Sequence, residues 1–126
     1  MQYSAILMRV ESLPFVENEQ KADAMIKSVL GHLASRMNEE EAKQFTKDLP
    51  KPLGINELRG HQINVTTISL DQFVSDLKEQ FKISTDQVQS LIRAVLHIVK
   101  EDTPSDHLKH WQEGLPSEWA SMLENA

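Results

Sequence analysis

The chain has 126 residues, of which 40% are hydrophobic and 25% are charged, with no cysteine and a formal net charge of −6. This length suits one domain that buries about two-thirds of the surface its unfolded chain exposes, and the composition differs from those of disordered or membrane-spanning chains. The missing cysteines exclude disulfides and thiolate catalysis, and an acidic second half (ten Asp/Glu against five Lys/Arg in residues 64–126) argues against binding to nucleic acid or anionic membranes.

At the start of the chain, residues 1–15 hold only a short apolar run. Arg9 and Glu11 interrupt it, so the pattern predicts neither a signal peptide nor a membrane helix. The expected location is therefore cytoplasmic.

Apolar residues recur at steps of three and four through most of the chain, which is the spacing of an amphipathic helix. Ala22, Met25 and Ile26, for example, begin a stripe that continues to Met37. The pattern predicts an all-α fold, with helices at 3–13, 18–36, 39–48, 70–81, 85–101 and 104–113 and shorter helical turns near 52–58 and 117–124.

Cap residues precede several of these helices. Ser69 with Gln72, and Ser84 with Gln87, fit the capping box, in which a serine side chain and a glutamine side chain each bind the other's backbone amide. Asn38 with Glu41 is a close relative of this box, and Thr103-Pro104 is expected to cap the next helix with proline in its first turn.

The stretch INVTTI at residues 63–68 is the exception to the helical pattern, because its β-branched residues favour extended chain. A lone strand is rarely stable, so we expect an ordered linker that lays Ile63, Val65 and Ile68 on the helices. The alternative is a strand that pairs with a second subunit or a partner peptide.

Two long segments of the chain match at a spacing of 66 residues. VLGHLASRMNEEEAKQFTKDLPKPL, from residue 29, lies without a gap on VLHIVKEDTPSDHLKHWQEGLPSEW, from residue 95. Both contain a Leu-Pro pair, and before Phe15 the better spacing is 67. This pattern predicts a tandem duplication.

The duplication divides the single domain into similar units of three to four helices. We expect a first unit at 1–58, a linker at 59–69 and a second unit at 70–126, packed as a helical bundle with a pseudo-twofold or superhelical arrangement.

The Leu-Pro pair ends the third predicted helix of each unit. Leucine continues the apolar stripe, and proline stops the helix because it has no amide hydrogen. Gly114 precedes the second pair and is expected to take a left-handed turn, which Asp48 at the matching position tolerates less well.

These segments carry a resemblance to a known family. They are DQFVSDL (71–77), RAVLHIV (93–99) and EGLPSEW (113–119) in the second unit, and KSVLGHLASRM (27–37) and EEAKQFTKDLP (40–50) in the first. In them the chain resembles, over nearly its whole length, a bacterial family known as domain of unknown function 2267. The resemblance implies an all-helical fold of two similar units and brings no catalytic residue with it.

Histidine is the side chain best suited to metal binding or to general-base catalysis near neutral pH. His107 and His110 lie three residues apart on one predicted helix, beside Asp106, a spacing that places two imidazoles on one face. Because Leu108 and Trp111 define the buried stripe and no third ligand is visible, we interpret them as surface histidines, with a metal site as the alternative.

Three apolar residues near the end of the chain are candidates for an interaction surface. Phe45 and Trp111 share a repeat position and are predicted to be core anchors. Trp119, together with Met122 and Leu123, would form an apolar patch suited to a partner or to a homodimer contact if it is exposed.

The sequence lacks any phosphate-binding glycine loop or nucleophile motif. It therefore predicts a non-enzymatic module without a cofactor, which works by binding a protein partner, by regulating one, or by self-association. The alternative is a small-molecule or metal-binding protein with a site between the two units, where His97, His107 or His110 converge.

Overall fold

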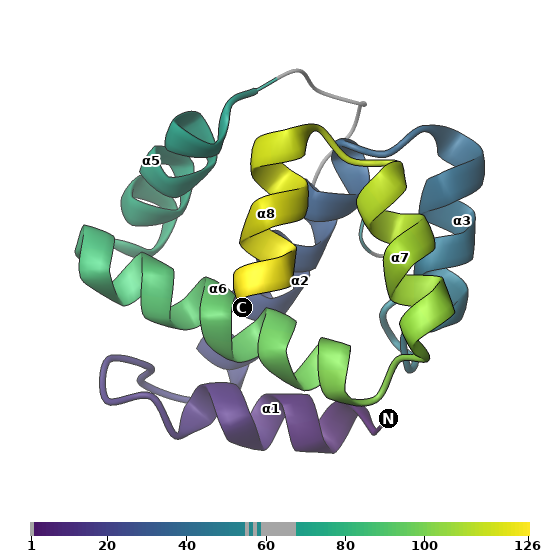
Figure 1. Cartoon of the computed structure of the whole chain (residues 1–126). Helices are drawn as coiled ribbons and strands as arrows, with labels where there is room; N and C mark the ends of the chain where they lie inside the picture. The colour runs from purple at the N-terminus through teal and green to yellow at the C-terminus, as the bar shows by residue number, and fades with distance from the viewer. Residues whose placement is uncertain (1, 55, 57, 59–67) are drawn as a thin grey trace.

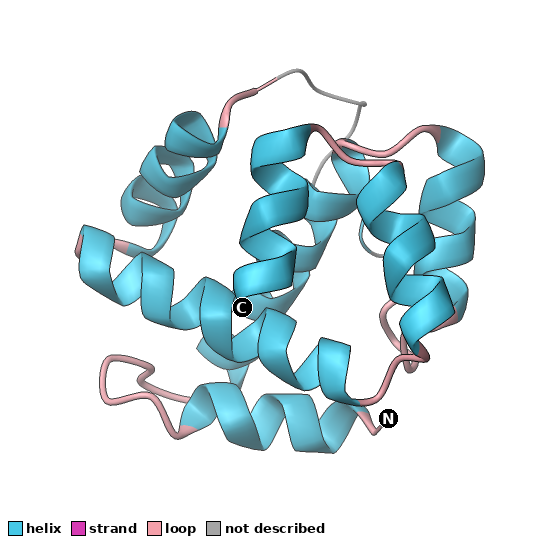
Figure 2. Cartoon of the chain, viewed as in Figure 1, coloured by secondary structure: helices cyan, strands magenta, loops and turns pink. Residues whose placement is uncertain are grey.

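The computed structural model describes residues 2–54, 56, 58 and 68–126, and within these ranges the chain forms helices and no strand (Figures 1 and 2). The helices, labelled as in Figure 1, are α1 (Tyr3–Glu11), α2 (Glu19–Ser35), α3 (Glu39–Lys47), α5 (Leu70–Phe81), α6 (Thr85–Glu101), α7 (Ser105–Glu113) and α8 (Ser117–Asn125). The all-α prediction is confirmed, and each predicted helix ends within two residues of its expected position.

Serine and asparagine side chains cap the helices at the predicted positions. Ser84 accepts a hydrogen bond from the Gln87 amide and Gln87 accepts one from the Ser84 amide, so this capping box is complete. Ser69 accepts from the Gln72 amide, but the Gln72 side chain donates to Asp76 at 2.7 Å. The second box is therefore only half formed.

The predicted cap at Thr103-Pro104 is wrong by one residue. Pro104 has extended backbone angles (φ −56°, ψ 143°) and itself precedes the first helical residue, Ser105. Thr103 is buried, and its hydroxyl donates to the Val99 carbonyl at 2.7 Å, which ties it to the end of α6.

Helix α2 runs through the middle of the molecule and contacts α1, α3, α5 and α6 (Figure 1). From Ser28 to Ser35 every one of its residues is buried, although the sequence indicates only a stripe. The polar side chains in this stretch are hydrogen bonded, as buried polar groups must be. His32 Nδ1 donates to the Ser28 carbonyl at 2.7 Å, and Ser28 donates to the Gln80 side chain at 3.0 Å.

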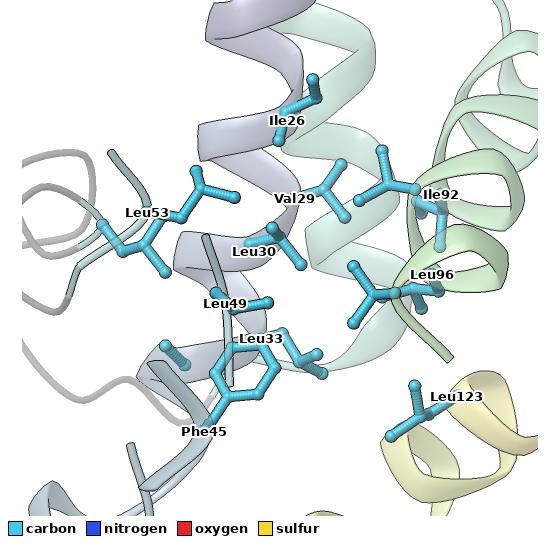
Figure 3. Close-up of a cluster of buried hydrophobic side chains, with 14 of the residues drawn as sticks. Ile26, Val29, Leu30, Leu33, Phe45, Leu49, Leu53, Ile92, Leu96 and Leu123 are labelled. Atoms are coloured by element: carbon cyan, nitrogen blue, oxygen red, sulfur yellow. The ribbon is translucent and has the colours of Figure 1, made fainter. Parts of the chain in front are cut away.

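One apolar core joins all seven described helices. Figure 3 shows the part where α2 faces α6, with residues from α3, α8 and the segment after α3 around it. The labelled residues are Ile26, Val29, Leu30, Leu33, Phe45, Leu49, Leu53, Ile92, Leu96 and Leu123. All of them are less than one-tenth exposed.

The helix bounds recur at the spacing of the predicted repeat. Helices α2 and α6 each have 17 residues and begin at positions 19 and 85, while α3 and α7 each have nine and begin at 39 and 105. Both pairs are 66 residues apart. The division into units at 1–58 and 70–126 and their symmetry stay predictions.

The two Leu-Pro corners have the same backbone form. Gly114 has φ −82° and ψ −5°, and Asp48 has φ −81° and ψ −10°, so both are right-handed and the left-handed turn predicted for Gly114 is wrong. Glycine at 114 leaves room for Glu41, because a Cβ there would lie 1.4 Å from Glu41 Oε2 and the Glu41 side chain would have to turn away. Among the described residues, the non-glycine residue with positive φ is Lys82 (φ 55°), which follows α5.

The predicted linker at 59–69, and the choice between ordered chain and strand at 63–68, lie almost wholly outside the described residues. Ile68 is described and packs against the core, half-buried.

Candidate functional site

His107 and His110 lie at a hollow of about 260 Å³ between α3 and α7. Its lining consists of Gln44, Lys47, Asp48, His107, His110 and Trp111. His107 Nδ1 lies 3.0 Å from one oxygen of Asp48 and 3.1 Å from the other, so the ring donates its N–H to the carboxylate. His97 is elsewhere, on α6, where it pairs with Glu101 at 2.7 Å.

The structure thus brings together two of the three histidines proposed from the sequence. Within the ranges that the structure describes, no three His, Cys, Asp or Glu side chains are placed to hold one metal ion. Asp48 orients His107 and lies 59 residues before it in the chain, a contact that sequence spacing alone does not indicate.

Contacts between α3 and α7 come in reciprocal pairs. The rings of Phe45 and Trp111, which share a repeat position, meet edge to face with centroids 4.7 Å apart, and both are buried as predicted. His107 on α7 contacts Asp48 at the end of α3. In the repeat-related contact, Glu41 on α3 lies over Gly114 at the end of α7. Such pairs are what the predicted twofold relation between units would produce, and that relation stays a prediction.

The expected surface at Trp119, Met122 and Leu123 is corrected by their burial. Trp119 and Leu123 are 0% exposed, and Met122 alone of the three is half-buried. Trp119 stacks on Phe73 with ring centroids 5.0 Å apart, and the Arg36 guanidinium lies 5.7 Å from its ring centroid. These contacts place the tryptophan in the core, where its large apolar ring stabilises the fold.

Met122 instead lines an open groove of about 290 Å³ between α5, α6 and α8. In Figure 1, α5 and α8 both stand above α6, with α5 further to the left than α8. The lining consists of Leu70, Asp71, Val74, Gln89, Ile92, Arg93, Met122, Asn125 and Ala126. The apolar residues of the lining are buried or half-buried, whereas the four polar residues at the rim are exposed. The groove therefore has an apolar floor and a polar rim.

Hydrogen bonds fix both walls of the groove to the rest of the domain. Glu118, at the start of α8, accepts from the Leu70 amide at 2.9 Å and so joins α8 to the start of α5. Lys100 on α6 donates to the backbone carbonyls of Glu124 at 2.6 Å and Ala126 at 3.2 Å. The groove is consequently built into the fold, as binding sites usually are.

Arg93 is the cation at the rim of the groove. It is exposed, and among the described residues it makes no hydrogen bond or ion pair. Its neighbours one turn away on α6 are Gln89 and His97, and neither of them is an acid. The five donors of this guanidinium are thus turned to solvent beside an apolar floor.

At the corresponding positions of the predicted first unit, polar side chains contact one another. Under the predicted repeat, Leu70, Gln89 and Arg93 correspond to Tyr3, Asp23 and Lys27. The Tyr3 hydroxyl donates to Asp23, and Lys27 Nζ lies 2.9 Å from the other oxygen of Asp23. Burial, and then the hydrogen bond to Asp23, raise the pKa of Tyr3 well above its ordinary value.

None of the described helices combines the length and apolar character needed to cross a membrane. The described residues form a small all-α domain with an open apolar groove between α5, α6 and α8 and a polar hollow between α3 and α7. Over residues 3–122 the chain matches the family described as "Uncharacterized conserved protein (DUF2267)", and it therefore belongs to that family. No curated protein and no solved structure matches the chain.

Sequence reasoning missed the groove. A signal was present on α5, where Leu70, Phe73, Val74, Leu77 and Phe81 form a stripe wider than one neighbouring helix covers. Phe73 and Leu77 are buried, while the other three are half-buried. The uncovered edge of this stripe is one wall of the groove.

Proposed function

We propose that the protein is a non-enzymatic interaction module, which receives an amphipathic helix of a partner protein in the groove between α5, α6 and α8. The observation that carries this proposal is the difference between the two units. The groove of the second unit is open and apolar with a solvent-facing arginine, while the corresponding side chains of the first unit, Tyr3, Asp23 and Lys27, contact one another. An open apolar groove between helices suits apolar side chains spaced three or four residues apart on a helix.

The size of the groove favours side chains of a partner over an enclosed small molecule. Its volume of about 290 Å³ lies at the lower limit of ordinary ligand pockets, which span roughly 300–1,000 Å³. It is also open to solvent along α5 and α8. A drug-sized ligand would remain largely exposed there, whereas two or three apolar anchors of a helix would be covered.

The proposal is tested by photo-crosslinking in the native cell. A benzophenone amino acid replaces Gln89, which is exposed at the rim, and a matched control carries it at Lys43, which is exposed on α3 outside the groove. We expect a discrete adduct from position 89 that is absent from position 43. The adduct should disappear when Met122→Arg places a cation over the apolar floor.

Three results would contradict the proposal. They are the same adducts from both positions, an adduct from position 89 that persists with Met122→Arg, or no adduct at all. An adduct of twice the mass of the chain would indicate self-association in place of a separate partner. Circular dichroism of each variant checks that its helices are intact.

The cytoplasmic location expected from the sequence stays a prediction.

The second candidate function is a ligand or metal site in the hollow between α3 and α7. The observation in its favour is that Asp48 holds the Nδ1–H of His107, which leaves Nε2 of that ring as the metal-binding nitrogen. Calorimetric titration with Zn²⁺ tests it. Binding that is lost in His107→Ala and kept in His97→Ala would support the site, and equal binding by both variants would refute it.

A further inference from the structure

The geometry points to the charge that the partner must carry: we propose that the occupant of the groove between α5, α6 and α8 presents a carboxylate to Arg93, so that the partner helix is acidic at one position beside its apolar anchors. This inference rests on the proposed function and names the chemistry of the partner. The first unit already contains the equivalent contact, between a cation and a carboxylate of the same chain.

In the first unit a lysine at the position corresponding to Arg93 has an internal carboxylate. Lys27 pairs with Asp23, four residues earlier on the same helix, at 2.9 Å. In the second unit the position of Asp23 is occupied by Gln89, which carries no charge. Both units therefore have a cation at this position of the repeat, but only the first has a carboxylate to pair with it. In the second unit a partner can supply the carboxylate.

The other charge at the rim, Asp71, does not remove this requirement. Asp71 lies in the first turn of α5, where the free backbone amides and the helix dipole favour a negative charge. Arg93 lies in the middle of α6, away from the ends of the helix that would favour a cation. Asp71 is thus stabilised by its own helix, while Arg93 has no such compensation.

Arginine is well suited to this recognition. Its planar guanidinium binds a carboxylate through two parallel hydrogen bonds, and its side chain also packs on apolar surface. The floor beside Arg93 is formed by Ile92, Val74 and Met122, so an acid and an apolar anchor one turn apart on a helix would meet both surfaces together. The second half of the chain is otherwise strongly acidic, which disfavours acids placed elsewhere on the partner.

Peptide display tests the inference with a defined probe. A library of random 16-residue helical peptides is selected on the full chain, and peptides that still bind the Met122→Arg variant are removed. We expect the remaining peptides to share Asp or Glu three or four residues from an apolar anchor. A parallel selection on Arg93→Glu should yield Lys or Arg at that position.

Affinities of the selected peptides give the expected magnitude. Loss of a partly exposed ion pair in Arg93→Gln should weaken binding about threefold, and charge reversal in Arg93→Glu about tenfold. Lys109→Glu is the matched control, because Lys109 is an exposed cation on α7 outside the groove, and it should leave affinity unchanged.

Two different failures are distinguishable. Peptides that depend on Met122 but carry no acid, or that bind Arg93→Glu as tightly as the unmodified protein, would overturn the carboxylate inference and leave the groove as a binding site. A selection that yields no peptide sensitive to Met122→Arg would overturn the proposed function, and the inference with it.

Discussion

Gly114 and Glu41 provide a test of how α3 and α7 pack. Alanine fits the backbone angles of Gly114, and Gly→Ala at such a position stabilises proteins by about 0.4–1 kcal/mol through the unfolded chain. The new Cβ, however, would lie 1.4 Å from Oε2 and 2.5 Å from Cδ of Glu41. Glu41 must therefore turn away, and it loses the hydrogen bond that it accepts from the Asn38 side chain.

We expect Gly114→Ala alone to leave the free energy of unfolding unchanged or to lower it by up to about 1 kcal/mol, because the lost contact offsets the gain. In a Glu41→Ala background the obstruction is absent, and the same change should raise it by about 0.4–1 kcal/mol. Urea unfolding followed by circular dichroism measures all four proteins, and the coupling should be about 1 kcal/mol. Equal effects in both backgrounds would refute the packing described between these residues.

Three further changes have expected outcomes that depend on single contacts. The pKa of Tyr3 is raised in the folded state, so its contribution to the free energy of unfolding is fully present below the pKa of the unfolded chain, about 10, and is lost as pH rises above that value. Tyr3→Phe should therefore lessen the fall in the free energy of unfolding between pH 8 and 11, measured by urea unfolding. Identical slopes in the two proteins would count against this role of Tyr3. Ser84→Ala removes a complete capping box and should lower the free energy of unfolding by about 1 kcal/mol, whereas the exposed mid-helix change Ser75→Ala should not lower it. Lys82→Gly relieves a left-handed residue and should raise the melting temperature measured by calorimetry; a lower value would show that this conformation is not strained.

The long helices were the most predictable part of the fold, because their signals agree. In α6 an apolar stripe of period three to four follows a capping box, and the predicted bounds, 85–101, match the structure. Helix α2 was located to within one residue at each end, but the burial of every residue from Ser28 to Ser35 was not foreseen. Periodicity shows which face is apolar, whereas the number of neighbouring helices depends on how distant segments pack.

The candidate site was less predictable for the same reason. Trp119 has the side chain typical of an interaction surface, yet stacking on Phe73 places it in the core. His107 and His110 were found from spacing within one helix, while their neighbour Asp48 is distant in sequence. The groove depends on the angle between α5 and α8 over α6, which the local pattern of apolar residues does not encode.

Binding of a partner helix in the groove is tested most directly by an amide chemical-shift map of the ¹⁵N-labelled chain titrated with the tightest peptide from the display selection. We expect the shifted amides to cluster at Leu70, Val74, Gln89, Arg93 and Met122, and the shifts to vanish in Met122→Arg. Shifts centred on α3 and α7, or spread evenly over the molecule, would contradict it.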